Sequence, residues 1–325
     1  MKKTVPKIPQ LIQRKIYKTG QTRGADDDVI YQNRVARNST VLIPYESWSK
    51  NFTFPKNETK FENGFIVLIP PKIYFSDKLI DKKLKAKGLK IGVNCLVFYY
   101  SRDEWNLYDP EKLKWKPAQN RKSPLGGKYV ARVPATTASE NGGQIRKGFT
   151  TTSGKGAGIR VFEYASTMTI EECRFQLEAL FWLCFDSETV MINNGMKKKD
   201  AILRKDFILK HCLQSKLLDY KKLVKVRLIN KNRKTTCPLC LEEISANGFF
   251  SRMKQAEGRN VADITVTEIN LFHVDELRVR EYNHRPYNLG WGHHHCNVVV
   301  KDSGIQKTLE WMKGVLQKNI ENGFI

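Results

Sequence analysis

The stretch with the densest potential for chemistry is NLGWGHHHCN, residues 288–297. It holds three consecutive histidines, one cysteine and two asparagines, in a chain that has only six His and seven Cys among 325 residues. A second motif, Cys237-x-x-Cys240, lies upstream in TCPLCLEEI. Imidazoles and thiolates are common ligands of transition-metal ions. The two segments together therefore predict a metal site.

The residues expected to hold the ion are Cys237, Cys240, His293 and Cys296. Two thiolates three positions apart can bind one tetrahedral ion from a tight turn, which Pro238 stiffens. His294 or His295 could replace His293, but a His and a Cys three positions apart share one helix face, which favours His293. The alternatives are a redox Cys-x-x-Cys pair or thiols that bind nothing. We expect a structural zinc site, which contributes about 10–16 kcal/mol when it assembles with the fold.

The segment between the two halves, residues 269–302, resembles the HNH nuclease motif, which has the ββα-metal fold. That motif has a His at the end of a first strand, an Asn about fifteen positions later, and a metal ligand on the following helix. Here these positions are held by His273 and Asn288, and zinc ligands follow Asn288 after five and eight positions, at His293 and Cys296. The upstream Cys-x-x-Cys pair also stands where zinc-containing HNH domains carry theirs.

The resemblance implies a role for each matching residue. His273 is the expected general base, because a neutral imidazole can take a proton from the attacking water. Asn288 is expected to hold the loop that carries this base. Asn297 matches the third position of the motif and is expected to ligate a hard divalent cation such as Mg²⁺. That cation polarises the scissile phosphate, and cleavage leaves 5′-phosphate and 3′-hydroxyl ends.

One position departs from the motif. The residue before the general base is often an Asp or His that binds metal, whereas this chain has Phe272. Asp275 or Glu276 could supply the missing carboxylate. Strand alternation favours Asp275, because it points to the same side as His273. The departure also supports an alternative function, a non-catalytic zinc-containing DNA-binding protein with a degenerate HNH fold.

The charge of the chain indicates a polyanionic partner. The formal net charge is +23, and residues 1–230 hold 43 Lys and Arg against 22 Asp and Glu, whereas residues 231–325 hold 13 against 11. Such a surface attracts nucleic acid, and we expect double-stranded DNA. The segment 118–158 is rich in Gly, Ser, Thr, Asn, Arg and Lys. It is interpreted either as a DNA-facing surface or as flexible surface loops.

Hydrophobic patterning predicts an α+β protein. Strands are expected at 64–75, 90–101 and 159–165, and a hairpin at 104–117 with Asp109-Pro110 at its turn. Helices are expected at 167–188, with Thr169 as N-cap, at 197–228, and at the C-terminal end. We expect a mixed, β-rich DNA-recognition domain (1–165), a helical connector (166–230) and a zinc-containing HNH domain (231–325).

Free buried thiols are expected in a protein of a reducing compartment, and we expect the cytoplasm. The Cys residues expected to be buried thiols are Cys95, Cys173, Cys184 and Cys212. No apolar run reaches about 18 residues, so no transmembrane helix or membrane partner is expected. The large basic part beside an HNH segment resembles the layout of HNH-type Type II restriction endonucleases, of the Type IIS kind by analogy. One such site cuts one strand, so double-strand cleavage would need a homodimer or a second binding event.

Overall fold

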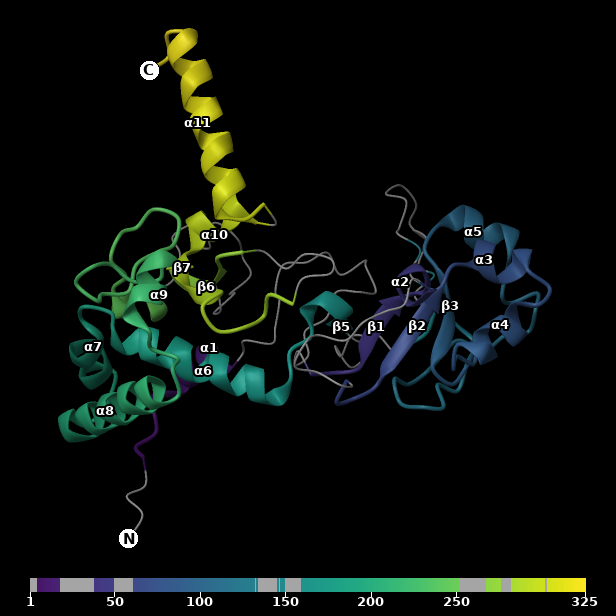
Figure 1. The fold of residues 1–325 in the computed structure, drawn as a ribbon, viewed down its shortest axis with the longest axis horizontal. Coiled ribbons are helices and arrows are strands. Elements are labelled where there is room, and N and C mark those ends of the chain that lie inside the picture. Colours follow the sequence, from purple (N-terminus) through teal and green to yellow (C-terminus); the bar gives the residue numbers. More distant parts are fainter. Residues whose placement is uncertain are drawn as a thin grey trace. The chain divides into compact units, whose positions relative to one another are not determined.

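The computed structural model describes residues 5–17, 38–49, 61–131, 133, 145, 147–149, 159–251, 267–275, 282–301 and 303–325. The chain forms two compact units, which Figure 1 labels by their elements. Unit 1 comprises Met1–Thr19 and Met168–Ile325, and unit 2 comprises Gly20–Thr167. Unit 2 therefore interrupts unit 1 in the sequence.

Unit 2 is built on a five-stranded sheet in which every neighbouring pair of strands is parallel. The strand order is β4-β3-β2-β1-β5. The strands are β1 (Val41–Pro44), β2 (Phe65–Ile69), β3 (Cys95–Tyr99), β4 (Tyr129–Ala131) and β5 (Ile159–Arg160). Its helices are α2 (Tyr45–Ser49), α3 (Pro71–Ser76), α4 (Ile80–Ala86) and α5 (Arg102–Leu107), with a 3₁₀ turn at Val161–Glu163. Near-continuous apolar strands such as FIVLI and CLVFY suit a parallel sheet covered on both faces.

Unit 2 differs from the sequence-based expectation in three places. The strand expected at 64–75 ends at Ile69, because Pro70 and Pro71 end it and Pro71 begins α3. The hairpin expected at 104–117 is wrong. Ser101 and Glu104 form a reciprocal capping box that starts α5 instead. The domain is thus a parallel sheet with helices rather than a β-rich fold, although the mixed α+β class is confirmed.

Unit 1 is mostly helical and carries one hairpin. Its helices are α1 (Gln10–Tyr17), α6 (Thr167–Trp182), α7 (Ser187–Asn193), α8 (Lys198–Gln214), α9 (Tyr220–Lys225), α10 (His294–Val300) and α11 (Ile305–Glu321). The strands β6 (Ile269–His273) and β7 (Leu289–His293) pair antiparallel, and a 3₁₀ turn spans Ala246–Phe249. Because α6 already begins at Thr167, Thr169 is inside the helix and is not its N-cap.

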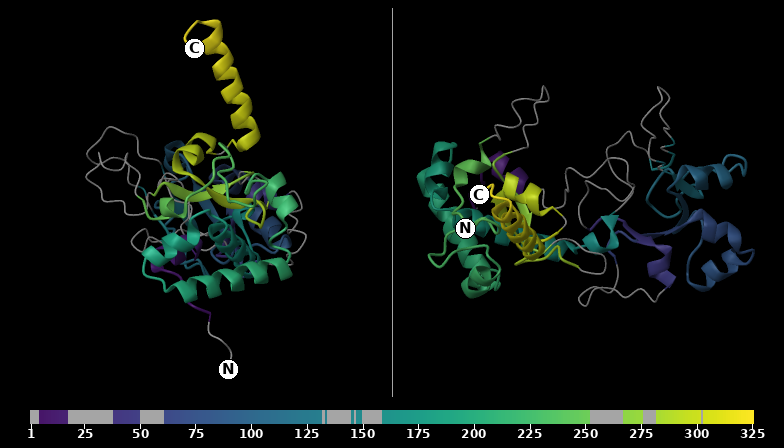
Figure 2. Two further views of the ribbon diagram at one scale, coloured as in Figure 1. Left: turned by 90° about the vertical axis from the view of Figure 1, so that its left-hand side faces the viewer. Right: turned by 90° about the horizontal axis from the view of Figure 1, so that it is seen from above.

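One hydrophobic core holds unit 1 together. Ile12 and Ile16 of α1 are buried in it together with α6, the 228–249 region and the β6–β7 hairpin. The segment expected as a connector thus shares its core with residues 231–325, and so do residues 8–16. The C-terminal helix packs through Ile305 and Thr308, and beyond its first turns it stands clear of the other elements of unit 1 (Figure 2).

No helix in the described part of the chain combines the length and apolar character needed to cross a membrane. The buried thiols expected at Cys95, Cys173, Cys184 and Cys212 are all buried and free. Most of the segment 118–158 that we interpret as a DNA-facing surface lies outside the described residues, as does Glu276.

Candidate active site and metal centre

The four predicted zinc ligands come together in unit 1. The ligand atoms of Cys237, Cys240, His293 and Cys296 all lie within 4.8 Å of one another. Within this cluster Cys240 Sγ lies 3.3 Å from His293 Nδ1. Three thiols and one imidazole around a common point are the donor set of a closed tetrahedral zinc site, so the residues fit this ion. It is the only grouping of three or more His, Cys, Asp or Glu side chains within the described residues.

The turn that carries the first two thiols is fixed by backbone hydrogen bonds. The Leu241 N–H donates to the Cys237 carbonyl, and the Cys237 N–H donates to the Glu242 carbonyl, both at 2.9 Å. Arg227 braces the turn from outside, because its Nε donates to the Pro238 carbonyl at 2.6 Å and its Nη2 to the Leu239 carbonyl at 3.1 Å. The Cys-x-x-Cys pair is therefore presented by a rigid turn.

The other two ligands lie where β7 passes into α10. His293 ends the strand and Cys296 is in the first turn of the helix. The side chains of the three consecutive histidines have different surroundings. His293 belongs to the cluster, while the exposed ring of His295 stacks on it with centroids 5.5 Å apart. His294 Nδ1 lies 3.1 Å from Asn270 Nδ2 of β6. The geometry therefore favours His293, rather than His294 or His295, as the imidazole ligand of the cluster.

Electrostatics within the cluster oppose ionisation of the Cys296 thiol when no ion is bound. Burial raises the pKa of the Cys296 thiol, and the neighbouring Cys237 and Cys240 raise it further. A bound cation reverses this preference, because a coordinating thiol is deprotonated. Burial also lowers the pKa of His294, as does its neighbour His295. The neutral form of His294 is thereby favoured, in which Nδ1 can accept from the Asn270 amide.

The hairpin leaves no room for larger side chains at two positions of the NLGWGH segment. A Cβ on Gly290 would lie 2.1 Å from Leu228 Cδ2, and one on Gly292 would lie 2.5 Å from the Phe272 ring. Phe272 itself is 0% exposed. It fills the core beside Gly292, and so the residue that precedes the expected general base has a packing role.

Asn288 ties the loop after β6 to the start of β7. Its Oδ1 accepts from the Asp275 N–H at 2.7 Å. Its Nδ2 donates to the carbonyls of Asp275 at 2.8 Å and Asn283 at 2.7 Å. Asn288 is only 2% exposed, so these bonds are shielded from water. This side chain fixes the backbone two residues beyond His273.

His273 is the last residue of β6 and is partly buried. Across the loop, the ring of His284 lies with its centroid 6.0 Å from that of His273, and His284 is 2% exposed. Asp275 is exposed, and Asn297 lies half-buried in α10, which packs against both β6 and β7. The hairpin, its loop and the helix therefore carry His273, Asp275, Asn288 and Asn297, while the Cys237–Cys240 turn joins them only through the metal cluster.

His284 is the residue of this region that sequence reasoning undervalued. In YNHRPYN it reads equally well as an ordinary loop residue or as a phosphate contact beside Arg285. The structure buries it next to His273, while Arg285 is exposed. A histidine four residues before a loop-fixing Asn is a weak signal, because its burial depends on how the whole loop folds back.

The chain thus has one unit built on a parallel sheet and a second unit in which a Cys₃His cluster joins the 237–240 turn to a strand–strand–helix motif. The profile of the BstXI restriction endonuclease family matches residues 14–294, and this chain belongs to that family. The matched range includes His273, Asn288 and three of the four cluster residues, and it ends at His294. The class of restriction endonucleases that the sequence resemblance indicated is thereby supported.

Comparison with other proteins adds little detail. None of the curated proteins matches this chain. Among solved structures, the crystal structure of a type II restriction endonuclease aligns with a TM-score of 0.30 and 14% identity. The alignment covers 49% of this chain and 57% of that chain, so the shared part spans little more than half of that protein.

Proposed function

We propose that this chain is a divalent-metal-dependent DNA endonuclease of the HNH type, in which the hairpin and helix of unit 1 carry out cleavage. The observation that carries the proposal is the loop fixed by Asn288, because this loop begins directly after His273 at the end of β6, and α10, which begins at the metal cluster, packs against the same hairpin. Membership in a restriction endonuclease family supports DNA as the substrate.

In this proposal His273 is the general base and takes a proton from the attacking water. Asn288 is a positioning residue, because its three hydrogen bonds go to backbone atoms. The Cys₃His cluster would hold a zinc ion, which would join the 237–240 turn to the β7–α10 junction and so fix the hairpin. Asn297 and Asp275 offer amide and carboxylate oxygens to a hard cation such as Mg²⁺. That cation, when bound, stabilises charge that develops on the phosphate.

Plasmid nicking in the presence of Mg²⁺ tests the proposal. We expect the wild type to convert supercoiled plasmid to nicked or linear forms, and His273→Ala to lose at least about a hundredfold in rate, as removal of a general base generally does. His295→Ala is the matched control, because this histidine is exposed and is not one of the four cluster residues. Equal zinc content and melting temperature in the three proteins would show that the fold is kept. Unaltered cleavage by His273→Ala would contradict the assignment.

The alternative function is a zinc-containing DNA-binding protein that has lost catalysis. It is favoured by Phe272, whose ring fills the core at the position where many HNH proteins have a metal ligand. The same assay separates the two functions when DNA binding is measured alongside. Retained binding without cleavage by the wild type, across Mg²⁺, Mn²⁺ and Ca²⁺, would support the alternative.

The finer classification is also part of the proposal. We propose a Type II enzyme that leaves 5′-phosphate and 3′-hydroxyl ends, with unit 2 reading a sequence and unit 1 cutting, as in the Type IIS arrangement. Because each chain offers one such site, cleavage of both strands needs a homodimer or a second binding event. Sequencing the ends of a digested complex DNA gives the site and the position of the cut. Accumulation of nicked plasmid at low enzyme concentration would indicate that the strands are cut separately.

A further inference from the structure

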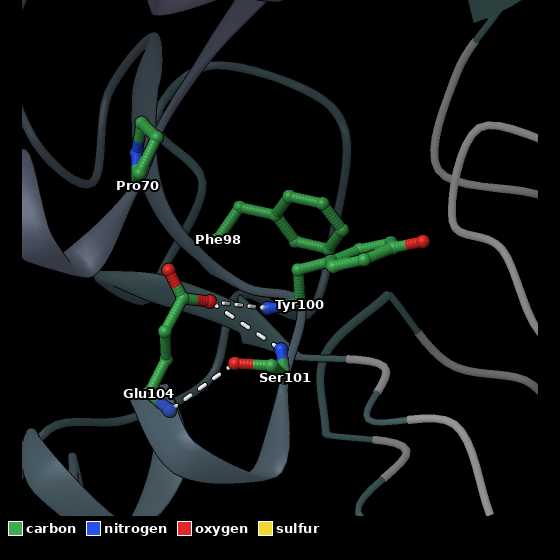
Figure 3. Close-up of a pocket in the computed structure, with 5 residues that line it drawn as sticks. All are labelled: Pro70, Phe98, Tyr100, Ser101 and Glu104. Carbon is green, nitrogen blue, oxygen red and sulfur yellow. Dashed lines mark hydrogen bonds between the residues drawn. The ribbon is translucent and has the colours of Figure 1, made fainter.

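A cavity of about 340 Å³ opens at the carboxyl edge of the parallel sheet in unit 2. It is lined by Pro70, Phe98, Tyr100, Ser101 and Glu104, which Figure 3 shows as sticks. Pro70 follows the end of β2 and Tyr100 follows the end of the neighbouring strand β3. Ligands of parallel α/β sheets bind at this edge, and the volume lies in the usual range of about 300–1,000 Å³ for small-molecule sites.

The acidic group of the cavity is the Glu104 carboxylate, and only one of its two oxygens accepts hydrogen bonds from the described residues. Glu104 Oε2 accepts from the N–H groups of Tyr100 at 3.2 Å and Ser101 at 3.3 Å, which completes the capping box of α5. The other carboxylate oxygen, Oε1, has no hydrogen-bond partner among the described residues and points away from these two bonds in Figure 3. The capping box therefore fixes the carboxylate and leaves one acceptor available in the cavity.

Two aromatic side chains form the other wall. Phe98 and Tyr100 lie on the same side of the chain at the end of β3, with ring centroids 6.1 Å apart. Phe98 is 8% exposed and forms the back of the cavity, whereas Tyr100 is 56% exposed. An exposed aromatic ring beside a fixed acceptor is a platform on which a planar ring can stack while its edge donates a hydrogen bond.

We propose that this cavity receives one unpaired nucleobase that carries an exocyclic amino group, namely adenine, cytosine or guanine, from bound DNA. The base stacks on Tyr100 and its amino group donates to Glu104 Oε1, whereas thymine has no amino group and its carbonyl oxygens are repelled by the carboxylate. The inference rests on the proposed function, in that it requires DNA binding. A metal ion is disfavoured, because Glu104 is the only acidic side chain among the five lining residues.

The charge of unit 2 is consistent with this ligand. Residues 20–167 hold 25 Lys and Arg against 14 Asp and Glu. The net positive charge attracts the DNA backbone without regard to sequence, so base selection must come from groups such as the Glu104 acceptor.

The test is Glu104→Gln. Gln also serves at this position of a capping box, so α5 is kept, but the cavity now presents an amide N–H₂ donor instead of an acceptor. Wild type and variant each select duplexes from a random pool without added Mg²⁺, and the bound fraction is sequenced. We expect the wild type to select against T at one position, and the variant to lose that discrimination by roughly 5- to 150-fold while the other positions are unchanged. Which of the three amino-bearing bases is enriched identifies the ligand.

Control variants distinguish base binding in the cavity from an effect on the N-terminal cap of α5 and from contacts made in a DNA groove. Asp103→Asn removes an exposed carboxylate of α5 that is not among the lining residues of the cavity, and it should leave base preference intact. Tyr100→Ala should weaken binding, whereas Tyr100→Phe should not, because the ring is kept. A mismatch opposite the selected base should tighten wild-type binding by about tenfold or more, because an unpaired base costs less to extrude. Equal preferences in wild type and Glu104→Gln would overturn the inference. A wild type that retains no DNA would instead refute the proposed function and this inference with it.

Discussion

The sheet of unit 2 has five parallel strands that are buried on both faces, whereas the hairpin of unit 1 has two strands of five residues each. An isolated two-stranded hairpin is at best marginally stable in water. In unit 1 three local features further stabilise the hairpin: the Cys₃His cluster, the hydrogen bonds of Asn288 and the close packing of Gly290 and Gly292. The hairpin of unit 1 therefore depends on a few individually identifiable interactions in addition to its hydrophobic core, while the sheet of unit 2 depends mainly on apolar packing.

The largest expected effect follows from breaking the metal cluster. Cys240→Ala should abolish tight zinc binding and loosen the hairpin, because an assembled structural zinc site contributes on the order of 10 kcal/mol. Cys240 is exposed, so the substitution leaves no cavity in the core. Zinc content and amide hydrogen exchange over 267–301 measure the result. Cys212→Ala, a buried thiol outside the cluster, should keep its zinc. Full zinc content in Cys240→Ala would contradict the assignment of the ligands.

A smaller effect distinguishes the two asparagines. Asn288→Ala should lower both the free energy of unfolding and the nicking rate, because each buried backbone group left unpaired costs about 1–3 kcal/mol. Asn297→Ala should change the free energy of unfolding by less than about 0.5 kcal/mol, since its side chain is half exposed, and yet reduce nicking. Urea unfolding and plasmid nicking give the two values. If both variants lost stability equally, Asn297 would be a structural residue.

The packing of the hairpin against the helical core is tested at Gly290. Gly290→Ala should destabilise unit 1 by about 1–3 kcal/mol, because the new Cβ would lie 2.1 Å from Leu228 Cδ2 and Leu228 is 0% exposed. Gly314→Ala is the contrasting substitution. Gly314 is in the middle of α11 with nothing within 4 Å of the added Cβ, so stability should rise by about 0.5–1 kcal/mol. Thermal unfolding measures both, and a neutral Gly290→Ala would indicate that Leu228 can move aside.

The smallest expected effect concerns the carboxylate of Glu62 in unit 2. Although burial raises the pKa of Glu62, hydrogen bonds from Thr167 and Asn38 outweigh it and hold the pKa below its ordinary value of 4.5. A carboxylate with a lowered pKa stabilises the fold above its unfolded pKa, and this stabilisation is lost as the pH falls through the folded pKa. Glu62→Gln should therefore lower the melting temperature slightly at neutral pH, and the difference should vanish well below pH 4.5. A difference independent of pH would show that the charge is not involved.

The hairpin and its cluster could be anticipated because their residues follow one another at short, fixed spacings. His273 ends β6 and the Asn288–Cys296 interval fixes the strand, the junction and the first turn of α10. The burial of His284 and the role of Phe272 in the core could not be anticipated in this way. Both depend on which distant side chains fill the surroundings, and spacing does not encode that.

The architecture of unit 2 was harder to predict. Apolar runs located β2 and β3, but nothing local specifies that the strands are parallel or that β1 pairs with both β2 and β5. The helix α5 had a usable signal in Ser101-x-x-Glu104, which the aromatic and Lys-rich composition of 104–117 obscured. The assignment of residues 1–165 to one domain places α1 with the sheet, whereas the structure packs it with unit 1, about 150 residues further along the chain.

The interruption of unit 1 by unit 2 has a consequence for how the protein is made. The apolar side chains of α1 emerge first from the ribosome, and their packing partners on α6 and beyond follow only after the whole sheet unit has been synthesised. During that interval Ile12 and Ile16 have no native surface to cover them. A fragment that begins near residue 168 would correspondingly expose the site that α1 occupies, so expression of residues 168–325 alone calls for α1 to be supplied, either fused through a short linker or added as a peptide.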